Sequence, residues 1–258
     1  MGLKLIVGRF PNWAMNGALA SPCFPLLPRT GLGISWPDDI ARFSGRRDLR
    51  VLFDVGANTG QTCDQIVRFY PRAEVHAFEP VSATCAELRR RMAGRGKIQV
   101  HQLALGRQPG ELRIRLQRDD QLNSLRYAFQ PGLVDTGETE LVTVSTVDEF
   151  ARARGIETID LLKVDAQGAD VEVLEGTEEM LRSHRIRFVL CEVGLQPDDE
   201  VNQPFQPLHE HLCARGLRLC GFYDGGNIGP RWRYACHRDA LYVDPQFPDF
   251  VPAVSKFG

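Results

Sequence analysis

The chain has 258 residues, 43% of them hydrophobic and 25% charged, and a formal net charge of −2 at pH 7. This length suits one α/β domain near the upper end of the usual size range. A net charge near zero excludes the strong positive field that recruits nucleic acid or an anionic membrane, and no apolar run approaches membrane-spanning length. The seven cysteines are odd in number and none forms a C-x-x-C pair, which favours reduced thiols and a cytoplasmic location.

Residues 1–48 are predicted to form an N-terminal extension. The first 35 are rich in Gly and Pro and indicate a loop, or a lid that covers the sheet, the active site or a partner subunit. A helix is expected from Trp36 to Phe43, because Pro37 suits its first turn and two acids follow it.

A strand, a glycine turn and a helix follow. Residues 51–55 form a short apolar run, and helical spacing of apolar residues predicts a helix over 62–69. Between them, Gly56 and Gly60 permit left-handed backbone angles and close approach to a ligand. The amino end of the helix adds unpaired N–H groups and a positive dipole end. Asp54 beside the turn favours a cationic amine or sulfonium over a diphosphate.

A second strand, predicted over 73–78, ends at Glu79. This acid stands about twenty residues beyond the glycines, the spacing at which a carboxylate reaches a ribose. The turn has one glycine fewer than the dinucleotide fingerprint, and Asn58 takes a position where a pyrophosphate would favour glycine. A glycine turn without a ligand is the alternative, but the acid favours a nucleoside-type cofactor such as S-adenosylmethionine.

The middle of the chain is predicted to add a helix, a strand and two alternating runs. Ser82 is expected to cap a helix that ends near Met92, and a third core strand is expected over 98–105. Residues 111–116 and 141–145 alternate with period two, and the long polar segment between them, which contains Ser124, is interpreted as a substrate-side or cofactor-side loop. Four arginines of this region are either solvated or bind an anionic acceptor: Arg113, Arg115, Arg118 and Arg126.

The last third of the chain is predicted to complete an α/β sheet. Thr146 is expected to cap a helix, and core strands over 159–164 and 187–191 deliver Asp165 and Glu192 at their tips. Helices are expected over 170–181 and 208–214, and the final strands, 217–223 and 240–243, are expected to be antiparallel to each other. The fold class is therefore a mostly parallel α/β sheet with an antiparallel C-terminal pair and helices on both faces. The main domain is placed at 49–245 and a loose tail at 246–258.

Four motifs together resemble one family. They are Asp54-Val-Gly-Ala-Asn58-Thr-Gly60, Ala77-Phe-Glu79-Pro80, Ala104-Leu-Gly106 and Leu162-Lys163-Val-Asp165-Ala-Gln-Gly168. The chain is similar, over roughly residues 49–243, to the FkbM family of S-adenosylmethionine-dependent methyltransferases. The resemblance implies a Rossmann-like class I methyltransferase sheet and methylation of oxygen on sugars, glycans or polyketides. The chain departs from the family at Gln167, where the family pattern has Glu, and this change leaves a metal or base role at that position without support.

The site residues follow from these motifs. The cofactor set is predicted to be Asp54, Gly56, Ala57, Asn58, Gly60, Glu79, Pro80, Ala104, Leu105 and Asp165. The catalytic candidates are Asp165, Glu192 and His237, as general base or orienting groups; Asp165 and Glu192 could instead hold a divalent cation or form a structural pair. The substrate candidates are Ser124, Gln167 and Tyr223, the last in a predicted turn over 222–227 that is either an aromatic platform or an ordinary hairpin turn. Lys163 is expected to point to the opposite face of the sheet, and no metal site is assigned.

The function predicted from the sequence is S-adenosylmethionine-dependent O-methylation of a hydroxyl on a sugar, glycan or secondary metabolite. Two alternatives stay open: an inactive cofactor-binding module of the same fold, suggested by Gln167, and a nicotinamide-dependent oxidoreductase. The expected partner is a small-molecule or glycan acceptor, without nucleic acid. Homo-oligomerisation is left open.

Overall fold

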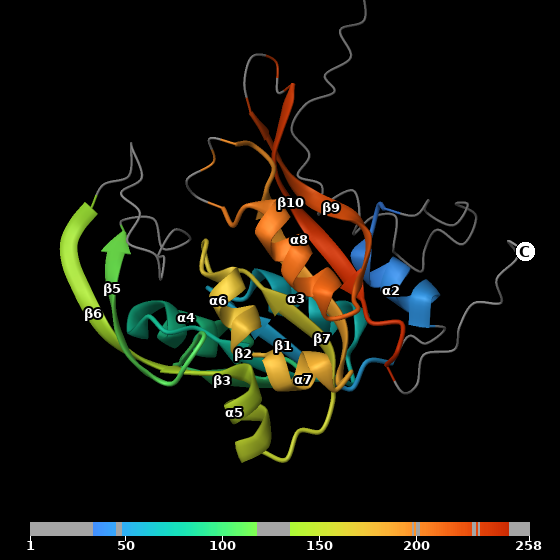
Figure 1. Ribbon diagram of the computed structural model, residues 1–258. Helices are drawn as coiled ribbons and strands as arrows, with labels where there is room; N and C mark the ends of the chain where they lie inside the picture. The colour runs from blue at the N-terminus through green and yellow to red at the C-terminus, as the bar shows by residue number, and fades with distance from the viewer. Residues whose placement is uncertain are drawn as a thin grey trace, which may run out of the picture.

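A computed structural model of the protein describes residues 33–44, 48–117, 135–197, 199, 202–228, 231 and 233–247. Its centre is a seven-stranded sheet in the order β3-β2-β1-β7-β8-β10-β9 (Figure 1). The strands are β1 (Val51–Val55), β2 (Glu74–Phe78), β3 (Lys97–His101), β7 (Ile159–Val164), β8 (Ile186–Gly194), β9 (Arg218–Ile228) and β10 (Tyr234–Val243).

The first five strands in this order pair in parallel, and β10 is antiparallel to both β8 and β9. Neighbouring strands β1 and β7 lead away in opposite directions in the strand order, so the topological switch point of the sheet lies between them. In open α/β sheets the ligand crevice lies at such a point, beyond the carboxyl ends of the strands. The predicted fold class is confirmed.

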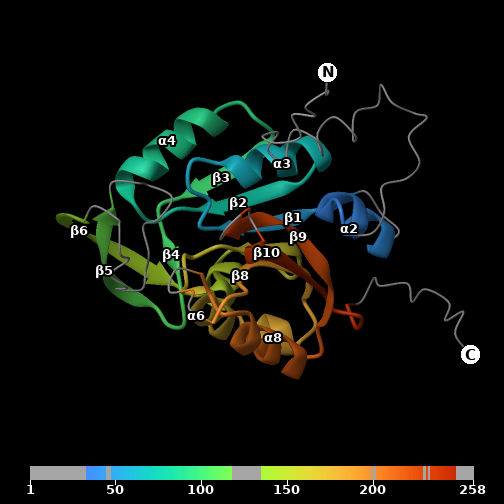
Figure 2. The same cartoon turned by 90° about the horizontal axis from the view of Figure 1, so that it is seen from above.

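Helices cover both faces of the sheet (Figure 2). One face carries α2 (Trp36–Ser44), α3 (Gln61–Phe69) and α4 (Ser82–Met92), whose buried side chains share a core with β1 and β2. The other face carries α5 (Val147–Ala153), α6 (Asp170–Glu175), α7 (Glu178–Arg182) and α8 (Phe205–Ala214), which share a second core with β7 and β8. The continuous burial of β7 reflects its apolar sequence and its place between the two layers.

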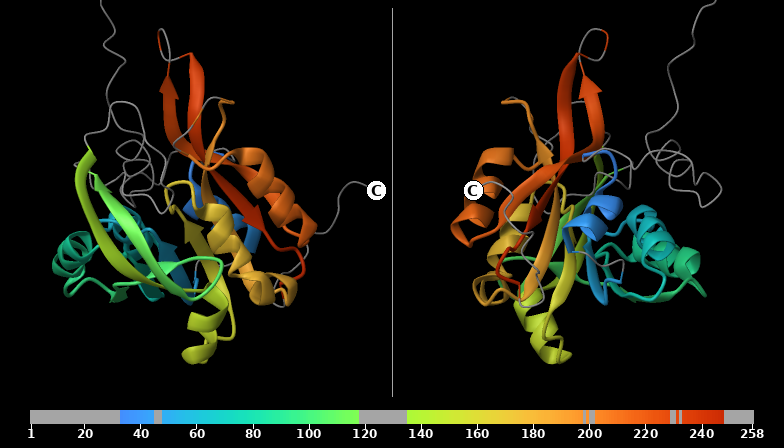
Figure 3. Two further views of the ribbon diagram at one scale, coloured as in Figure 1. Left: turned by 60° about the vertical axis from the view of Figure 1, so that its left-hand side comes forward. Right: turned by 90° about the vertical axis from the view of Figure 1, so that its right-hand side faces the viewer.

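A small second sheet corrects the prediction of a single strand over 98–105. The chain leaves the main sheet after His101, and β4 (Ala104–Leu105) pairs instead with β6 (Asp135–Ser145), which pairs with β5 (Gly110–Gln117). The long β5–β6 hairpin stands beside the main sheet (Figure 3). Because β6 begins at Asp135, the segment that contains Ser124 is shorter than predicted, and it lies outside the described residues.

Two predicted helix features near the site are wrong. The single helix over 170–181 is two helices, because Gly176 passes so close to the 106 turn that a Cβ atom on it would lie 2.0 Å from the carbonyl oxygen of Gly106. Ser82 is the first residue of α4 rather than its cap, and its amide and hydroxyl contact the Glu140 carboxylate. The Thr146 cap is confirmed, since its hydroxyl accepts from the Glu149 amide at 3.0 Å.

The antiparallel strands are longer than the sequence indicates. Residues 222–227, predicted as a turn, continue inside β9. Gly225 has φ +96°, and a Cβ atom on it would lie 2.2 Å from the His237 carbonyl oxygen, so the glycine marks an irregularity in strand pairing rather than a chain reversal. Glu192 likewise lies inside β8 and not after it.

Helix α2 packs into the domain although the sequence places it in the extension. Trp36 and Ile40 are 2% and 0% exposed, within the core of α3 and α4. The boundaries at 48 and 245 stay predictions. In the part of the chain that the structure describes, no helix is long and apolar enough to cross a membrane.

Candidate functional site

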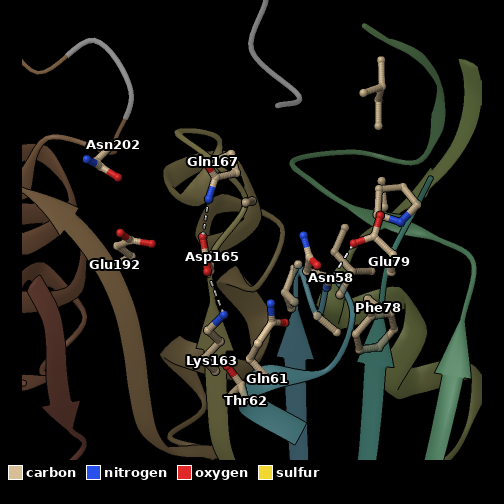
Figure 4. A pocket seen from close by; sticks show the side chains of 18 of the residues that line it. Asn58, Gln61, Thr62, Phe78, Glu79, Lys163, Asp165, Gln167, Glu192 and Asn202 are labelled. Carbon is tan, nitrogen blue, oxygen red and sulfur yellow. Dashed lines mark hydrogen bonds and ion pairs between the residues drawn. The ribbon is translucent and has the colours of Figure 1, made fainter. Parts of the chain in front are cut away.

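A cavity of about 560 Å³ opens at the carboxyl ends of the parallel strands (Figure 4). Glu79 lies at one end, Asp165 in the middle, and Glu192 and Asn202 at the other end. The wall is formed by Val55, Gly56, Ala57, Asn58, Gln61, Thr62, Phe78, Glu79, Pro80, Leu103, Ala104, Leu105, Ile114, Lys163, Asp165, Ala166, Gln167, Glu192, Asp199, Asn202, Cys236 and His237.

The glycine turn at the end of β1 is held by backbone contacts. The Gly56 and Ala57 amides donate to the Phe78 carbonyl oxygen at 3.1 and 2.9 Å. Gly56 has φ +75°, and a Cβ atom on it would lie 1.9 Å from the Asp165 carbonyl oxygen. The left-handed angle agrees with the sequence expectation, and the neighbouring strand end also requires a glycine here; close approach of a ligand stays a prediction. Gly60 does not line the cavity; its missing Cβ leaves room for Leu88 and Met92 of α4.

Glu79 is buried at the tip of β2 and faces the cavity. It is 7% exposed, and its two carboxylate oxygens accept from the Asn58 amide at 3.1 Å and the Val81 amide at 3.0 Å. Because a carboxylate has about four acceptor positions, two backbone bonds fix its direction and leave it suited to further donors such as ribose hydroxyls. The prediction that this acid faces the ligand site agrees with its position.

Asp54 and Lys163 lie side by side on the same face of the sheet, and only Lys163 lines the cavity. Asp54 is fully buried and does not line the cavity, whereas Lys163 does, with its Nζ 3.6 Å from Asp54 Oδ1 and 3.0 Å from Asp165 Oδ2. Residues two apart in a strand share a face, so Lys163 and Asp165 point the same way. Burial alone would lower the pKa of Lys163, but the carboxylates of Asp165, Asp54 and Asp239 outweigh it and raise that pKa, so the ammonium keeps its charge.

Asp165 is held from two sides. Besides Lys163, the Gln167 Nε2 donates to Asp165 Oδ1 at 3.0 Å, and Gln167 takes a left-handed backbone angle of φ +49°. An amide can donate here, whereas a glutamate at this position would place a second negative charge against Asp165. Gln167 therefore completes the network that orients Asp165.

Glu192 and His237 meet at the far end. His237 Nε2 lies 3.5 Å from Glu192 Oε1. Burial raises the pKa of Glu192 to about 8, with the carboxylates of Asp165 and Asp239 adding to the effect. Burial also lowers the pKa of His237, and Arg238 adds to that shift. The arrangement offers a carboxyl group that takes up a proton near neutral pH, beside an imidazole that is neutral there.

The structure adds residues that the sequence did not single out. Asp199 and Asn202 come from the loop after β8, where Asp199 accepts from the Asn202 amide and side chain at 3.0 and 2.8 Å. Gln61 and Thr62 come from the first turn of α3. The α3 residues follow directly from the glycine turn and were within reach of prediction, whereas the loop carries no motif.

Two of the predicted substrate residues, Tyr223 and Ser124, are not found in the cavity wall. Tyr223 is 2% exposed, does not line the cavity, and donates its hydroxyl to Asp39 Oδ2 at 2.9 Å, because β9 turns this side chain under α2. Ser124 lies outside the described residues. Within the described residues no three Asp, Glu, His or Cys side chains are arranged to hold a metal ion, and the metal alternative stays untested.

Residues 54–222 match the model of the methyltransferase FkbM domain. The chain belongs to this family. Among curated proteins it is similar to three methyltransferases. They are 31-O-demethyl-FK506 methyltransferase FkbM of Streptomyces tacrolimicus (33% identity, 55% of this chain and 65% of that one), Methyltransferase 1 of Beauveria bassiana (27%, 55% and 62%) and 2-O-methyltransferase NoeI of Sinorhizobium fredii (24%, 63% and 69%). The match spans about two thirds of the length of these relatives.

The family confirms the prediction of a methyltransferase domain that uses S-adenosylmethionine. The cavity of this FkbM-family protein fits that cofactor. Apolar Phe78, Leu105 and Ile114 stand near Glu79 and suit an adenosyl group, and Asp165 suits an ammonium or sulfonium.

Proposed function

We propose that the protein is an O-methyltransferase that acts on a hydroxyl of a sugar, glycan or secondary metabolite. The observation that carries the proposal is the placing of Glu79 and Glu192 at opposite ends of one cavity. Two relatives support it by their names, a 2-O-methyltransferase and a 31-O-demethyl-FK506 methyltransferase.

Bound S-adenosylmethionine supplies a methyl group that its sulfonium has already activated, so the protein mainly aligns the reactants and excludes water. Glu79 would hold the ribose hydroxyls, and Asp165, fixed by Lys163 and Gln167, would hold the ammonium group of the amino-acid part. Glu192 would take the proton of the acceptor hydroxyl, whose oxygen would receive the methyl group as the sulfur–methyl bond breaks and S-adenosylhomocysteine leaves with the bonding electron pair. His237, 3.5 Å away, orients Glu192.

The acceptor end favours a neutral, hydroxyl-rich molecule. Its wall presents Gln167, Asn202 and His237 as hydrogen-bonding groups beside Asp199 and Glu192. The cation on the cavity wall, Lys163, lies against two carboxylates. An anionic acceptor would meet these acids, which favours the first of the two alternatives for the arginines, that they are solvated. Arg113 is exposed on β5, and Arg118 and Arg126 lie outside the described residues.

The main observation behind the inactive-module alternative was Gln167, and this residue takes part in the Asp165 network instead of breaking it, so the alternative is disfavoured.

The oxidoreductase alternative is disfavoured by β10, which runs antiparallel in a sheet whose dinucleotide-binding counterpart is mostly parallel.

Transfer of a radiolabelled methyl group from S-adenosylmethionine to a panel of neutral sugars, oligosaccharides and macrolides tests the proposal. We expect incorporation with at least one hydroxyl acceptor and its loss in Glu192→Gln. The exposed Glu210→Gln on α8 serves as the matched control. Binding of the cofactor without transfer to any acceptor of the panel would favour the inactive module.

A further inference from the structure

A row of ionisable side chains crosses the sheet on the face that α2, α3 and α4 cover. Strand register places Asp54 beside Lys163 and Lys163 beside Leu190. Glu192 is two residues beyond Leu190 and so shares its face. In the antiparallel pair β8–β10, Asp239 lies directly opposite Glu192. Side chains of directly opposite residues stand on the same face with their Cβ atoms about 5 Å apart.

Positive charge along this row is scarce. Lys163 lies at one end, 3.6 Å from Asp54 and 3.0 Å from Asp165. Arg238 follows along β10 from His237, but its guanidinium donates to the carbonyl oxygens of Gly226 and His237 and to Asn227 Oδ1, at 2.6 to 2.7 Å. Glu192 and Asp239 are therefore two half-buried carboxyl groups, and among the described residues neither forms an ion pair with a Lys or Arg side chain.

Charged groups from several neighbouring elements bear on the protonation of the pair. Lys163 of β7, Asp165 after β7 and Asp170 of α6 act on Glu192, and Lys163, Asp165 and Asp224 of β9 act on Asp239. His237 of β10 lies against Glu192 and is itself affected by Arg238 and Asp199, and Asp54 of β1 lies against Lys163. Carboxyl groups outnumber cations in this set, so its balance favours protonation of one member.

We propose that Glu192 and Asp239 share one proton in the ligand-free protein, and that a cationic ligand in the cavity displaces this proton to solvent. Two neighbouring buried carboxyl groups do not both ionise near neutral pH, because each charge opposes the other. A positive ligand beside Asp165 and Glu192 removes that opposition, and the proton leaves for the buffer. Asp239 is then a positioning residue, since it acts through Glu192 and does not line the cavity.

The direction of the pKa shifts agrees with a shared proton. Burial raises the pKa of Glu192 to about 8, with the Asp165 and Asp239 carboxylates adding to it. Burial raises the pKa of Asp239 to about 7, which Lys163 opposes and Asp165 reinforces.

The inference rests on the proposed function only in its last step, where displacement of the proton by bound S-adenosylmethionine leaves Glu192 ionised and ready to act as the base. The sulfonium gives S-adenosylmethionine one more positive charge than S-adenosylhomocysteine. The first ligand should therefore displace more of the proton than the second. The pair thus couples binding of the methyl donor to ionisation of Glu192, the proposed base.

Infrared difference spectra of the ligand-free protein test the pair without any ligand. We expect a protonated carboxyl C=O band at about pH 7 that is lost by about pH 10. Part of this band should be missing in the Asp239→Asn variant. The whole band should be unchanged in the control variant Glu210→Gln. Glu192→Gln, the second variant, should remove the same part. A band that is identical in Asp239→Asn and the wild-type protein would overturn the shared proton.

Calorimetric titration with S-adenosylmethionine in buffers of different ionisation enthalpy tests the displacement. At about pH 7 we expect release of up to about one proton per ligand, less with S-adenosylhomocysteine, and little release in Asp239→Asn. Equal release in Asp239→Asn and wild type would overturn the displacement. Failure of both ligands to bind, with the infrared band present, would reject the proposed function while the shared proton stands.

Discussion

The two ends of the cavity are built in different ways. The cofactor end comes from β1, β2 and β4, which lie in one stretch of the sequence, and its shape depends on backbone contacts such as the Gly56 and Ala57 amides on the Phe78 carbonyl oxygen. The acceptor end comes from β8, β10 and the loop between β8 and α8, and it depends on side-chain charge. The first end therefore tolerates little change in shape, and the second end little change in charge.

The largest effect should come from removing charge at the acceptor end. Glu192→Gln keeps the size of the side chain but cannot accept the proton, so we expect kcat to fall by about 10² to 10⁴. Affinity for S-adenosylhomocysteine should change only a few-fold, because Glu79 and the glycine turn are intact. Steady-state kinetics and calorimetry measure the two quantities. If affinity for S-adenosylhomocysteine fell by as large a factor as kcat, the two ends of the cavity would not have separate roles in cofactor binding and catalysis.

A change of shape at the cofactor end should instead unfold or weaken the domain. Gly56→Ala adds a Cβ atom 1.9 Å from the Asp165 carbonyl oxygen, at a φ of +75°. Because neither backbone can move without disturbing the sheet, we expect a loss of about 3 kcal/mol or more in the free energy of unfolding.

Urea denaturation measures this loss, with Gly110→Ala as the control. A Cβ atom at Gly110 meets nothing within 4 Å, so the control should change stability by less than about 1 kcal/mol. Equal stability of the two variants would show that the β1 turn adapts more freely than its contacts imply.

A smaller effect should follow from removing the charge of Glu79. Glu79→Gln keeps the length of the side chain but weakens its bonds to the Asn58 and Val81 amides and to a ribose. We expect binding of S-adenosylhomocysteine to weaken by about 10- to 100-fold. Glu111→Gln, at an exposed position on β5, is the control for calorimetry. An unchanged affinity of Glu79→Gln for S-adenosylhomocysteine would show that the Glu79 carboxylate does not bind the ribose.

The pH dependence of stability should be the smallest and most diagnostic effect. The pKa values of Glu192 and Asp239 are raised to about 8 and about 7, so the folded state binds more protons than the unfolded state between about pH 4 and pH 8. Their stabilisation is complete below about pH 4 and is lost as the pH rises through about 8. The free energy of unfolding should therefore fall across this window.

Asp239→Asn should flatten that slope and stabilise the protein by about 1 to 2 kcal/mol at about pH 9. Some slope should persist, because burial also raises the pKa of Asp170 to about 7. Urea denaturation between about pH 4 and pH 8 measures the free energy of unfolding of the wild-type protein and of Asp239→Asn. Equal slopes with pH in the two proteins would contradict mutual repulsion between the Glu192 and Asp239 carboxyl groups.

The cofactor end was predictable because its signals are local. Strand, glycine turn and helix follow one another from Val51, and Glu79 follows at a fixed spacing, so short-range pattern is enough to place them. The second requirement for Gly56, its close contact with Asp165, was not predictable in this way, because β7 is distant in the sequence and adjacent to β1 only in the fold.

The acceptor end was only partly predictable because it depends on long-range pairing. Glu192 and His237 were found, but Asp239 was not, since nothing in a single strand shows that it stands opposite Glu192. The pair Gly225-Gly226 has the composition of a turn yet serves an irregular strand. The direction of Lys163 was available from strand alternation and was assigned wrongly.

A crystal structure of the complex with S-adenosylhomocysteine tests the central claim most directly. The account predicts the ribose hydroxyls on Glu79, the amino-acid part beside Asp165, and an opening between the sulfur and Glu192 wide enough for an acceptor. A ribose bound away from Glu79, or a sulfur that faces away from Glu192, would contradict it.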